Sequence, residues 1–350
     1  MRISIDHIKW QRIILLIVLA YEALGAMTGG LLLIMKPDGK FMDMPVNLMH
    51  GTFLNFLMPG IILTAMGILS ALAFVLLIRR KQNDWLWACI ALGGWFIWFY
   101  TEIIILQELH WLHLMWAVPV LIGIIVVIPL VIARNNTDSM LEGLLYCGVL
   151  SSLWYVFVSV YVPFYYVGYT PASQTVSELS SYGAPTRILW VLLATFYPLL
   201  FGAFGWGVFY TAENNKRLRI AAGFIIAYSV FNFYWPPMDK REVISAVGRS
   251  LNDSLHIGWT IVTMLLAIAI MTFSAGGSGK KFRIYTSISI MLMIVFGILT
   301  AKDTPALEAN LPTPMMGIWE RASEAVYFLW VMALAVKLLY VVRQHRLVQI

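Results

Sequence analysis

Long apolar runs constrain this chain more than any other feature, because each is about as long as a helix that crosses a membrane. Such a helix needs roughly 20 mostly apolar residues to span a hydrocarbon core about 30 Å thick. Only helices or closed barrels satisfy the backbone inside lipid, and barrel strands have only about ten residues. The sequence therefore predicts an all-α, polytopic integral membrane protein with about ten transmembrane helices. The predicted spans are residues 11–35, 53–78, 84–106, 112–133, 141–166, 187–211, 217–235, 253–274, 282–301 and 316–342.

Composition supports a protein whose surface lies mostly in hydrocarbon. Of the 350 residues, 60% are hydrophobic and 12% are charged, whereas soluble domains average roughly 45–50% and 25%. The net charge of +6 does not require nucleic acid, because Lys and Arg anchor the loops of membrane proteins. We therefore expect membrane lipids as partners and no nucleic acid. Cys89 and Cys147 lie in apolar runs and are too few for a disulfide framework or a thiolate metal site.

The basic residues predict the orientation of the spans. When the N-terminus is placed in the cytoplasm, two thirds of the 24 Lys and Arg residues fall on cytoplasmic segments. This distribution follows the positive-inside rule. An even number of spans then places both termini in the cytoplasm. The first apolar run is too long for a cleavable signal, whose apolar part has roughly 7–15 residues, so we expect it to be a retained span.

A polar stretch, Asn135-Asn136-Thr137-Asp138-Ser139, separates the first four spans from the last six. We predict a four-helix bundle over residues 1–134 and a six-helix bundle over residues 140–350. In the first span, the small residues of Gly25-Ala26-Met27-Thr28-Gly29-Gly30 predict the close approach of another helix. In the second module, the hydroxyl-rich stretch 173–180 predicts a short helix with a Ser or Thr cap.

Polar residues in the first module lead to two hypotheses. Glu22 lies near the middle of a span, where an ionised carboxylate is costly and faces a partner or water. It indicates either a proton or cation role or a hydrogen-bonded structural glutamate. The outer ends of these spans carry His50, Glu102, Glu108, His110 and His113. Imidazoles with carboxylates form zinc sites, but histidines beside tryptophans are also typical of the membrane interface, so the metal stays unknown.

The strongest candidate site lies at the outer ends of the last six spans. Under the predicted topology, that level is shared by Glu178, Arg187, Asp239, His256, Glu320 and Arg321. Carboxylate and imidazole groups suit acid–base chemistry, so Asp239, His256 and Glu320 are candidate catalytic residues. Glu178, Arg187 and Arg321 are candidate ligand-binding residues, because guanidinium groups bind anionic head groups. Carboxylate–arginine pairs that lock loops are the structural alternative, and a Ser–His–Asp triad has no spacing signature here.

Several elements of the second module occur in a characteristic order along the chain. They are Ser177-Glu178-Leu179, Gly183-Ala184-Pro185-Thr186-Arg187, Pro237-Met238-Asp239, His256 and Gly317-Ile318-Trp319-Glu320-Arg321. In this order, residues 140–345 resemble the six-helix prokaryotic membrane proteins described as domain of unknown function 998. The resemblance implies a prokaryotic plasma membrane and supplies no activity. The Phe-Pro-x-Asp element of that family stands here as Trp235-Pro236-Pro237-Met238-Asp239.

The first module resembles a separate small four-helix membrane family. Its Pro37-Asp38-Gly39 turn and its Pro59-Gly60 bend carry that resemblance. This resemblance likewise supplies no activity.

Three hypotheses for function follow. The leading one is a multi-pass membrane protein whose outer polar cluster binds a lipid or small amphiphile, with hydrolysis or group transfer as its chemistry. A shared site would fail if His256 lay more than about 12 Å from both Asp239 and Glu320, beyond the reach of direct or single-water contact. The alternatives are a membrane transporter that uses Glu22 and a non-catalytic membrane assembly subunit. The sequence leaves open whether the protein is an enzyme and which cofactors it uses.

Overall fold

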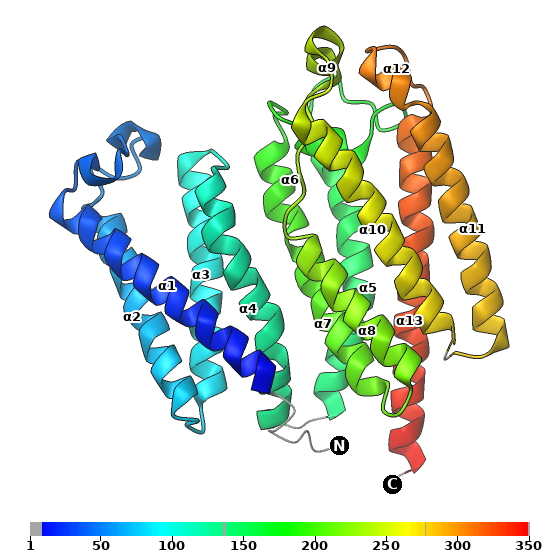
Figure 1. The fold of residues 1–350 in the computed structure, drawn as a ribbon, viewed down its shortest axis with the longest axis horizontal. Coiled ribbons are helices and arrows are strands. Elements are labelled where there is room, and N and C mark those ends of the chain that lie inside the picture. Colours follow the sequence, from blue (N-terminus) through cyan, green and yellow to red (C-terminus); the bar gives the residue numbers. More distant parts are fainter. Residues whose placement is uncertain (1–8, 136–137, 277, 349–350) are drawn as a thin grey trace. The chain divides into compact units, whose positions relative to one another are not determined.

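The computed structural model describes residues 9–135, 138–276 and 278–348, in which the regular elements are helices and none is a strand (Figure 1). Nine helical segments of these residues are long and apolar enough to cross a membrane. The chain is therefore a multi-pass membrane protein, as the sequence predicts. The segments are Lys9–Met35, Leu57–Ile78, Asp84–Leu106, Trp111–Ala133, Ser139–Tyr165, Arg187–Thr211, Leu251–Gly276, Lys280–Glu308 and Met316–Gln344. Asn136 and Thr137 of the predicted linker, and both chain ends, lie outside this description.

The chain forms two compact units, Met1–Thr137 and Asp138–Ile350. Unit 1 contains α1 (Lys9–Met35), η2 (Lys40–Met42), η3 (Val46–Met49), α2 (Leu57–Ile78), α3 (Asp84–Leu106) and α4 (Trp111–Asn135). Unit 2 begins with α5 (Asp138–Tyr161), η4 (Val162–Tyr165), η5 (Val176–Ser180), α6 (Arg187–Ala194), α7 (Phe196–Thr211) and α8 (Lys216–Phe231). It continues with α9 (Arg241–Val247), α10 (Leu251–Gly276), α11 (Lys280–Lys302), α12 (Thr304–Glu308) and α13 (Met316–Val348).

The predicted span at residues 217–235 is shorter in the structure. Its helix α8 has 16 residues, which at 1.5 Å per residue gives a length of about 24 Å, less than the roughly 30 Å core. The chain has no helical structure over residues 234–240. Trp235 and Pro236 each precede a proline, and residues before proline avoid the helical region, so this segment favours an extended backbone. The number of crossings and the side of the membrane on which the ends lie stay predictions.

In unit 1, α1 packs against α2 and α4, and α3 packs against the same two helices. The close approach of α1 to α2 depends on glycine. A Cβ atom on Gly30 would lie 2.3 Å from Thr64 Oγ1 and 2.8 Å from the Gly60 carbonyl oxygen. This contact confirms the packing role that the sequence predicts for the small residues of the first span.

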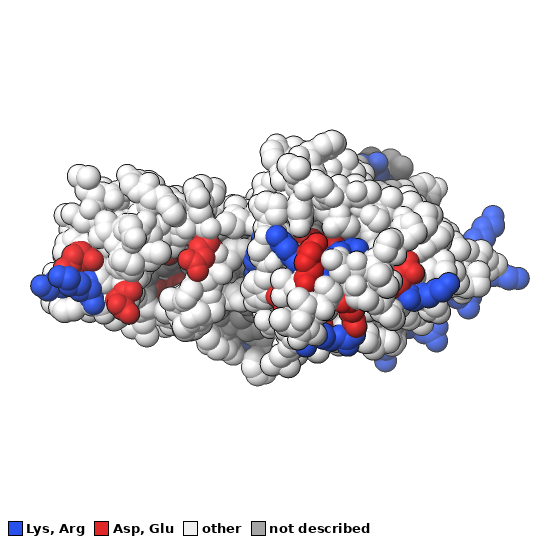
Figure 2. All heavy atoms as spheres, turned by 90° about the horizontal axis from the view of Figure 1, so that it is seen from above, with Lys and Arg blue, Asp and Glu red and all other residues white. Residues whose placement is uncertain are grey.

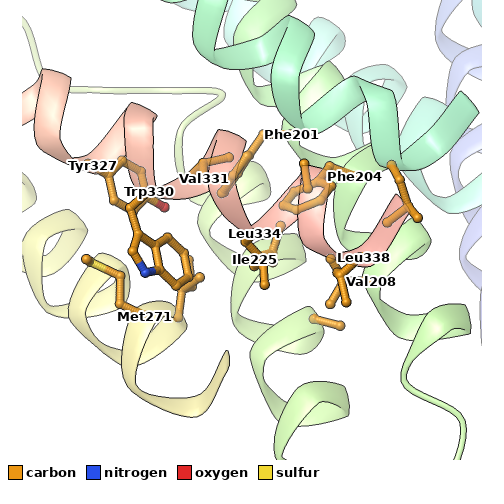
Figure 3. Close-up of a cluster of buried hydrophobic side chains, with 14 of the residues drawn as sticks. Phe201, Phe204, Val208, Ile225, Met271, Tyr327, Trp330, Val331, Leu334 and Leu338 are labelled. Atoms are coloured by element: carbon orange, nitrogen blue, oxygen red, sulfur yellow. The ribbon is translucent and has the colours of Figure 1, made fainter. Parts of the chain in front are cut away.

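Unit 2 packs around α13, which contacts α5, α7 and α11. Its core brings together Phe201 and Phe204 of α7, Ile225 of α8, Met271 of α10 and Trp330 of α13 (Figure 3). Lipid is as apolar as these side chains, so close van der Waals packing, rather than the hydrophobic effect, holds membrane helices together. Fully buried side chains such as Phe201 and Trp330 supply that packing.

One end of unit 2 carries the short elements η5, α9 and α12 with their loops, and we call it the η5 end (Figure 1). A small apolar cluster joins α9 and α12 and contains Met238, Ile244 of α9, Leu307 of α12 and Met316. Seen from above, acidic and basic side chains lie close together at this end, surrounded by uncharged surface (Figure 2). The η5 end therefore carries a group of charged side chains beside helices that are largely apolar.

The η5 helix has the cap that the sequence predicts. It is a short 3₁₀ helix whose N-cap is Thr175, and Thr175 forms a capping box with Glu178. In this box the N-cap hydroxyl and the glutamate carboxylate satisfy each other's backbone N–H groups. The box fixes the start of η5 and so the position of Ser177, its second residue.

Candidate functional site

A cavity of about 530 Å³ lies in unit 2 at the η5 end. The charged and hydroxyl groups that line it include Ser177, Asp253, His256, Glu320 and Glu324. These residues come from η5, α10 and α13, so the cavity is bounded by segments that are far apart in the sequence. Its polar side chains lie where the membrane-spanning helices meet the loops of the η5 end.

Apolar and aromatic side chains line the rest of the cavity. They include Trp190, Trp259, Met264, Met293 and Phe328. Ile261 of α10 and Ala301 of α11 also line it, and both are exposed. The cavity therefore reaches the surface of the unit along these two helices.

A histidine–serine contact stands in the cavity wall. His256 Nε2 lies 3.0 Å from Ser177 Oγ, and His256 Nδ1 lies 2.6 Å from the carbonyl oxygen of Pro236. A carbonyl oxygen only accepts, so in the neutral imidazole Nδ1 carries the proton and donates it. Nε2 is then the acceptor, and the Ser177 hydroxyl donates to it. His256 is only 8% exposed, so the packing around it also restricts its ring.

The Pro236 carbonyl is available because the chain around it is not helical. Pro237 follows directly and keeps Pro236 out of the helical region. Asp253 holds this segment to α10, since its Oδ1 accepts from the Asp239 backbone N–H at 2.7 Å. The other oxygen of Asp253 accepts from the N–H and the hydroxyl of Ser250, both at 2.8 Å. Asp253 thus caps α10 and fixes the loop that orients His256.

Glu320 of α13 fixes the backbone of η5 next to Ser177. Its Oε2 accepts from the backbone N–H of Val176, the residue before Ser177. One turn further along α13, Glu324 Oε1 accepts from the Tyr155 hydroxyl at 2.9 Å. His256 of α10 and Glu320 of α13 therefore contact consecutive residues of η5, and both line the cavity.

A buried ion pair ties α9 to η5. Arg241 donates to Glu178 twice, from Nη2 to Oε1 at 2.6 Å and from Nε to Oε2 at 3.0 Å. The two side chains are 11% and 5% exposed. Such a two-pronged pair fixes geometry as well as charge. The pair therefore fixes η5, which contains Ser177, against α9.

Arg321 supports the same loop from α13. Its Nη1 donates to the carbonyl oxygens of Pro171 and Gln174, and its Nη2 donates to the Tyr169 hydroxyl at 2.6 Å. Burial raises the pKa of that hydroxyl above its usual value. Tyr169 therefore stays neutral and donates its proton to the Thr175 carbonyl oxygen at 2.7 Å. The result is a rigid platform for the start of η5.

Buried polar atoms on the cavity wall without a hydrogen-bond partner among the residues that the structure describes include the Tyr327 hydroxyl and Trp259 Nε1. Tyr327 is only 5% exposed. A buried polar group without a partner costs free energy. A ligand with hydrogen-bond acceptors would satisfy both atoms.

Comparison of the sequence with known families finds one that covers the residues around this cavity. The model of the family described as "Protein of unknown function (DUF998)" matches residues 149–337, more than half of the 350 residues. The chain belongs to the DUF998 family. The matched residues contain the whole lining of the cavity, from Tyr155 to Phe328. No curated protein and no solved structure matches the chain.

The DUF998 match lies within unit 2 and confirms the resemblance predicted for the second module. It includes no residue of unit 1, so the resemblance of the first module to a small four-helix family stays a prediction.

The six residues that the sequence predicts for the site in unit 2 fall into two groups. His256 and Glu320 line the cavity, whereas Glu178, Arg187, Asp239 and Arg321 are not among its lining residues. Arg187 donates to the Ser180 carbonyl oxygen at 2.6 Å and lies over the Tyr182 ring. Asp239 joins the network through its backbone N–H. The catalytic and ligand-binding roles given to all six stay predictions.

The sequence pattern does not single out four residues that build the candidate site. Ser177 is one member of a motif, Asp253 begins a predicted span, and no local pattern indicates a role for Tyr155 or Arg241. Arg241, rather than Arg187 or Arg321, is the ion-pair partner of Glu178. The two residues are 63 positions apart, so no local pattern indicates the pair.

The polar residues of unit 1 have a different arrangement. Glu22 is 1% exposed, and its Oε1 has no hydrogen-bond partner within the described part of the chain. Its transport role stays a prediction. The described residues hold no group of three or more His, Cys, Asp or Glu placed to bind a metal, so the structure gives the zinc alternative for His110 and His113 no support. His113 Nδ1 instead accepts from the His110 backbone N–H at 3.0 Å.

Proposed function

We propose that unit 2 binds a lipid or small amphiphile in the cavity and acts on its polar end by hydrolysis or group transfer. The observation that carries the proposal is the divided lining of the cavity. Its charged side chains lie toward the η5 end, whereas its lining along α10 and α11 is mostly apolar, with Thr260, Thr263 and Thr300 among it. The volume of about 530 Å³ falls in the range of roughly 300–1,000 Å³ that is typical of small-molecule sites.

The arrangement of side chains favours one orientation of the ligand. The head group lies against Ser177, His256 and Glu320, where polar side chains replace its contacts with water. The apolar part lies along Trp259 and Met264, toward the exposed surface of α10 and α11. A membrane lipid would enter from the bilayer along these helices without crossing a polar loop.

The proposal places the η5 end on the outer side of a prokaryotic plasma membrane, with both termini in the cytoplasm. This orientation rests on the excess of basic residues in the segments at the other end of the spans. The ligand would then come from the outer leaflet or the outer aqueous phase. The alternatives of a non-catalytic assembly subunit and of a transporter that uses Glu22 place the activity elsewhere and require no ligand in this cavity.

Native mass spectrometry of the full chain, purified in mild detergent with membrane lipid, tests the proposal. We expect a stoichiometric lipid or amphiphile adduct on the wild-type chain. Gly297→Trp should remove it, because Gly297 lines the cavity and a Cβ there already lies 2.9 Å from the flexible end of Met264. The new side chain would fill the space that the ligand needs.

Gly258→Trp is the matched control, since Gly258 lies on α10 outside the lining and a Cβ there has nothing within 4 Å. The control should keep the adduct. An adduct that survives Gly297→Trp, or a wild-type chain that carries none even after lipid is added back, would contradict the proposal.

A further inference from the structure

We propose that Ser177 and His256 form a nucleophile–base pair that hydrolyses an acyl ester held in the cavity. The inference rests on the proposed function and names the substrate class and the reaction. Both side chains line the cavity, and His256 Nε2 lies 3.0 Å from Ser177 Oγ. A nucleophile and a base within about 2.6–3.2 Å, with the base oriented by a third group, is the arrangement by which enzymes activate serine.

The third group here is the backbone carbonyl of Pro236. Its oxygen lies 2.6 Å from His256 Nδ1, so it selects the tautomer in which Nε2 accepts a proton. In Ser–His–Asp enzymes a carboxylate has this orienting role. In this chain the carboxylate of Asp253 fixes the carbonyl indirectly, through the backbone of Asp239. Pro236 and Asp253 are therefore positioning residues.

The neighbouring serines show that Ser177 differs from a serine that only completes a turn. Ser180 donates to the Ser177 carbonyl oxygen, and Ser181 donates to the Glu178 carbonyl oxygen at 2.9 Å. Those two side chains are 2% and 1% exposed. Ser180 also lines the cavity, but Ser177 keeps more accessible surface and has an imidazole as its partner. The Ser177 hydroxyl is therefore the more accessible of these three.

The lining also indicates the class of ligand. An acyl chain suits the apolar wall that includes Trp259, Met264 and Phe328. Ester oxygens are acceptors, and the buried Tyr327 hydroxyl and Trp259 Nε1 are donors without a partner in the described residues. Trp259 also stacks on His256, with ring centroids 6.2 Å apart. The cavity therefore offers apolar contacts for the acyl chain of such an ester and hydrogen-bond donors for its ester oxygens.

The reaction has two steps. Ser177 Oγ bonds to the ester carbonyl carbon while its proton passes to His256 Nε2. The bond from that carbon to the alcohol oxygen then breaks, the alcohol takes the proton from Nε2, and an acyl group stays on Ser177. Water next adds to the acyl carbon and gives a proton to Nε2. The bond to Ser177 Oγ breaks as that proton returns to it, so the carboxylic acid leaves and both residues are restored.

A long-chain alkyl fluorophosphonate probe tests the nucleophile on the full chain in detergent micelles. It should label one site, which peptide mass spectrometry would locate at Ser177. Ser177→Ala should abolish the labelling, and His256→Gln should slow it by at least about 100-fold, the lower range for loss of a general base. Hydrolysis of an octanoyl ester should fall in parallel in the two variants, because paired residues act as a unit.

Ser173→Ala is the control, since the Ser173 hydroxyl only donates to the Thr170 carbonyl oxygen in the same loop. It should keep both labelling and turnover. Native mass spectrometry of Ser177→Ala separates the two proposals, because this variant should still carry the amphiphile adduct. A wild-type chain that holds the adduct but resists the probe, or labelling that persists in Ser177→Ala, would overturn the catalytic pair while leaving binding intact.

Discussion

Three arginine side chains fix the polar segment that leads into η5. Arg241 faces a carboxylate, Arg321 faces carbonyl oxygens and a tyrosine, and Arg187 faces a carbonyl oxygen. The guanidinium group presents several donors in a fixed plane, so it can hold a loop in one geometry. All three arginines act on residues 169–180, the segment that leads into and forms η5.

The Arg241–Glu178 pair gives a prediction at the scale of single residues. Arg241→Ala should lower the free energy of unfolding of unit 2 by about 3–5 kcal/mol, the usual result of leaving a buried charge without its partner. Thermal unfolding of the purified chain in detergent measures the change. Lys40→Ala breaks the exposed Lys40–Asp38 pair and should leave the transition almost unchanged. Equal shifts in the two variants would show that the buried pair contributes little.

Short elements and glycine contacts determine how the long helices of this chain are positioned against one another. The 3₁₀ helix η5 has five residues, yet it places Val176 and Ser177 against two different helices. The interruption between α6 and α7 at Thr195 comes shortly before Pro198, whose nitrogen has no proton to continue the hydrogen-bond ladder. In unit 1, the crossing of α1 and α2 depends on a single row of small residues.

That crossing gives a prediction at the scale of elements. Gly30→Ala should destabilise unit 1 by about 1–3 kcal/mol, as overpacking does, because its Cβ would lie 2.7 Å from the Thr64 backbone nitrogen. Gly29→Ala should be neutral or stabilising by about 0.5–1 kcal/mol, since alanine is the better helix former. Its Cβ would lie at an ordinary 3.6 Å from Leu63. Thermal unfolding of both variants decides the matter, and a neutral Gly30→Ala would contradict the close crossing.

At the scale of the whole molecule, the balance of basic residues predicts which side of the membrane each end faces. Helix α10 has 26 residues, a length of about 39 Å at 1.5 Å per residue. It therefore separates α9 from the start of α11 by one complete crossing. The positive-inside rule places α9 outside and the basic start of α11, at Lys280 and Lys281, in the cytoplasm.

Cysteine labelling on intact cells tests this orientation. In a chain with Cys89→Ala and Cys147→Ala, a membrane-impermeant maleimide should label Ser245→Cys on α9 directly. It should label Lys281→Cys on α11 only after the cells are permeabilised, since both positions are exposed in the structure but lie at opposite ends of α10. The reverse pattern would invert the topology, and labelling of both from outside would contradict a complete crossing by α10.

The limits of sequence reasoning are clearest at α8 and at the zinc alternative. The apolar run at 217–235 predicts a full span, but its helix ends at Phe231 because the following residues lead into two prolines. His110 and His113 have a spacing that would fit a metal site, yet a backbone N–H uses the ring nitrogen of His113. In both cases a local pattern is real, and the neighbouring backbone decides how it is used.

The sequence by itself determined that the chain is helical and lies in a membrane, that its second half resembles DUF998 proteins, and that a Ser or Thr caps a short helix in the stretch 173–180. Those features depend on the run lengths, the composition and the order of nearby residues, which are written along the chain. Only the tertiary structure decided that Ser177 meets His256, 79 positions away, and that Glu178 pairs with Arg241. Such contacts depend on how helices cross and where loops fold back, so no periodicity or spacing in the sequence records them.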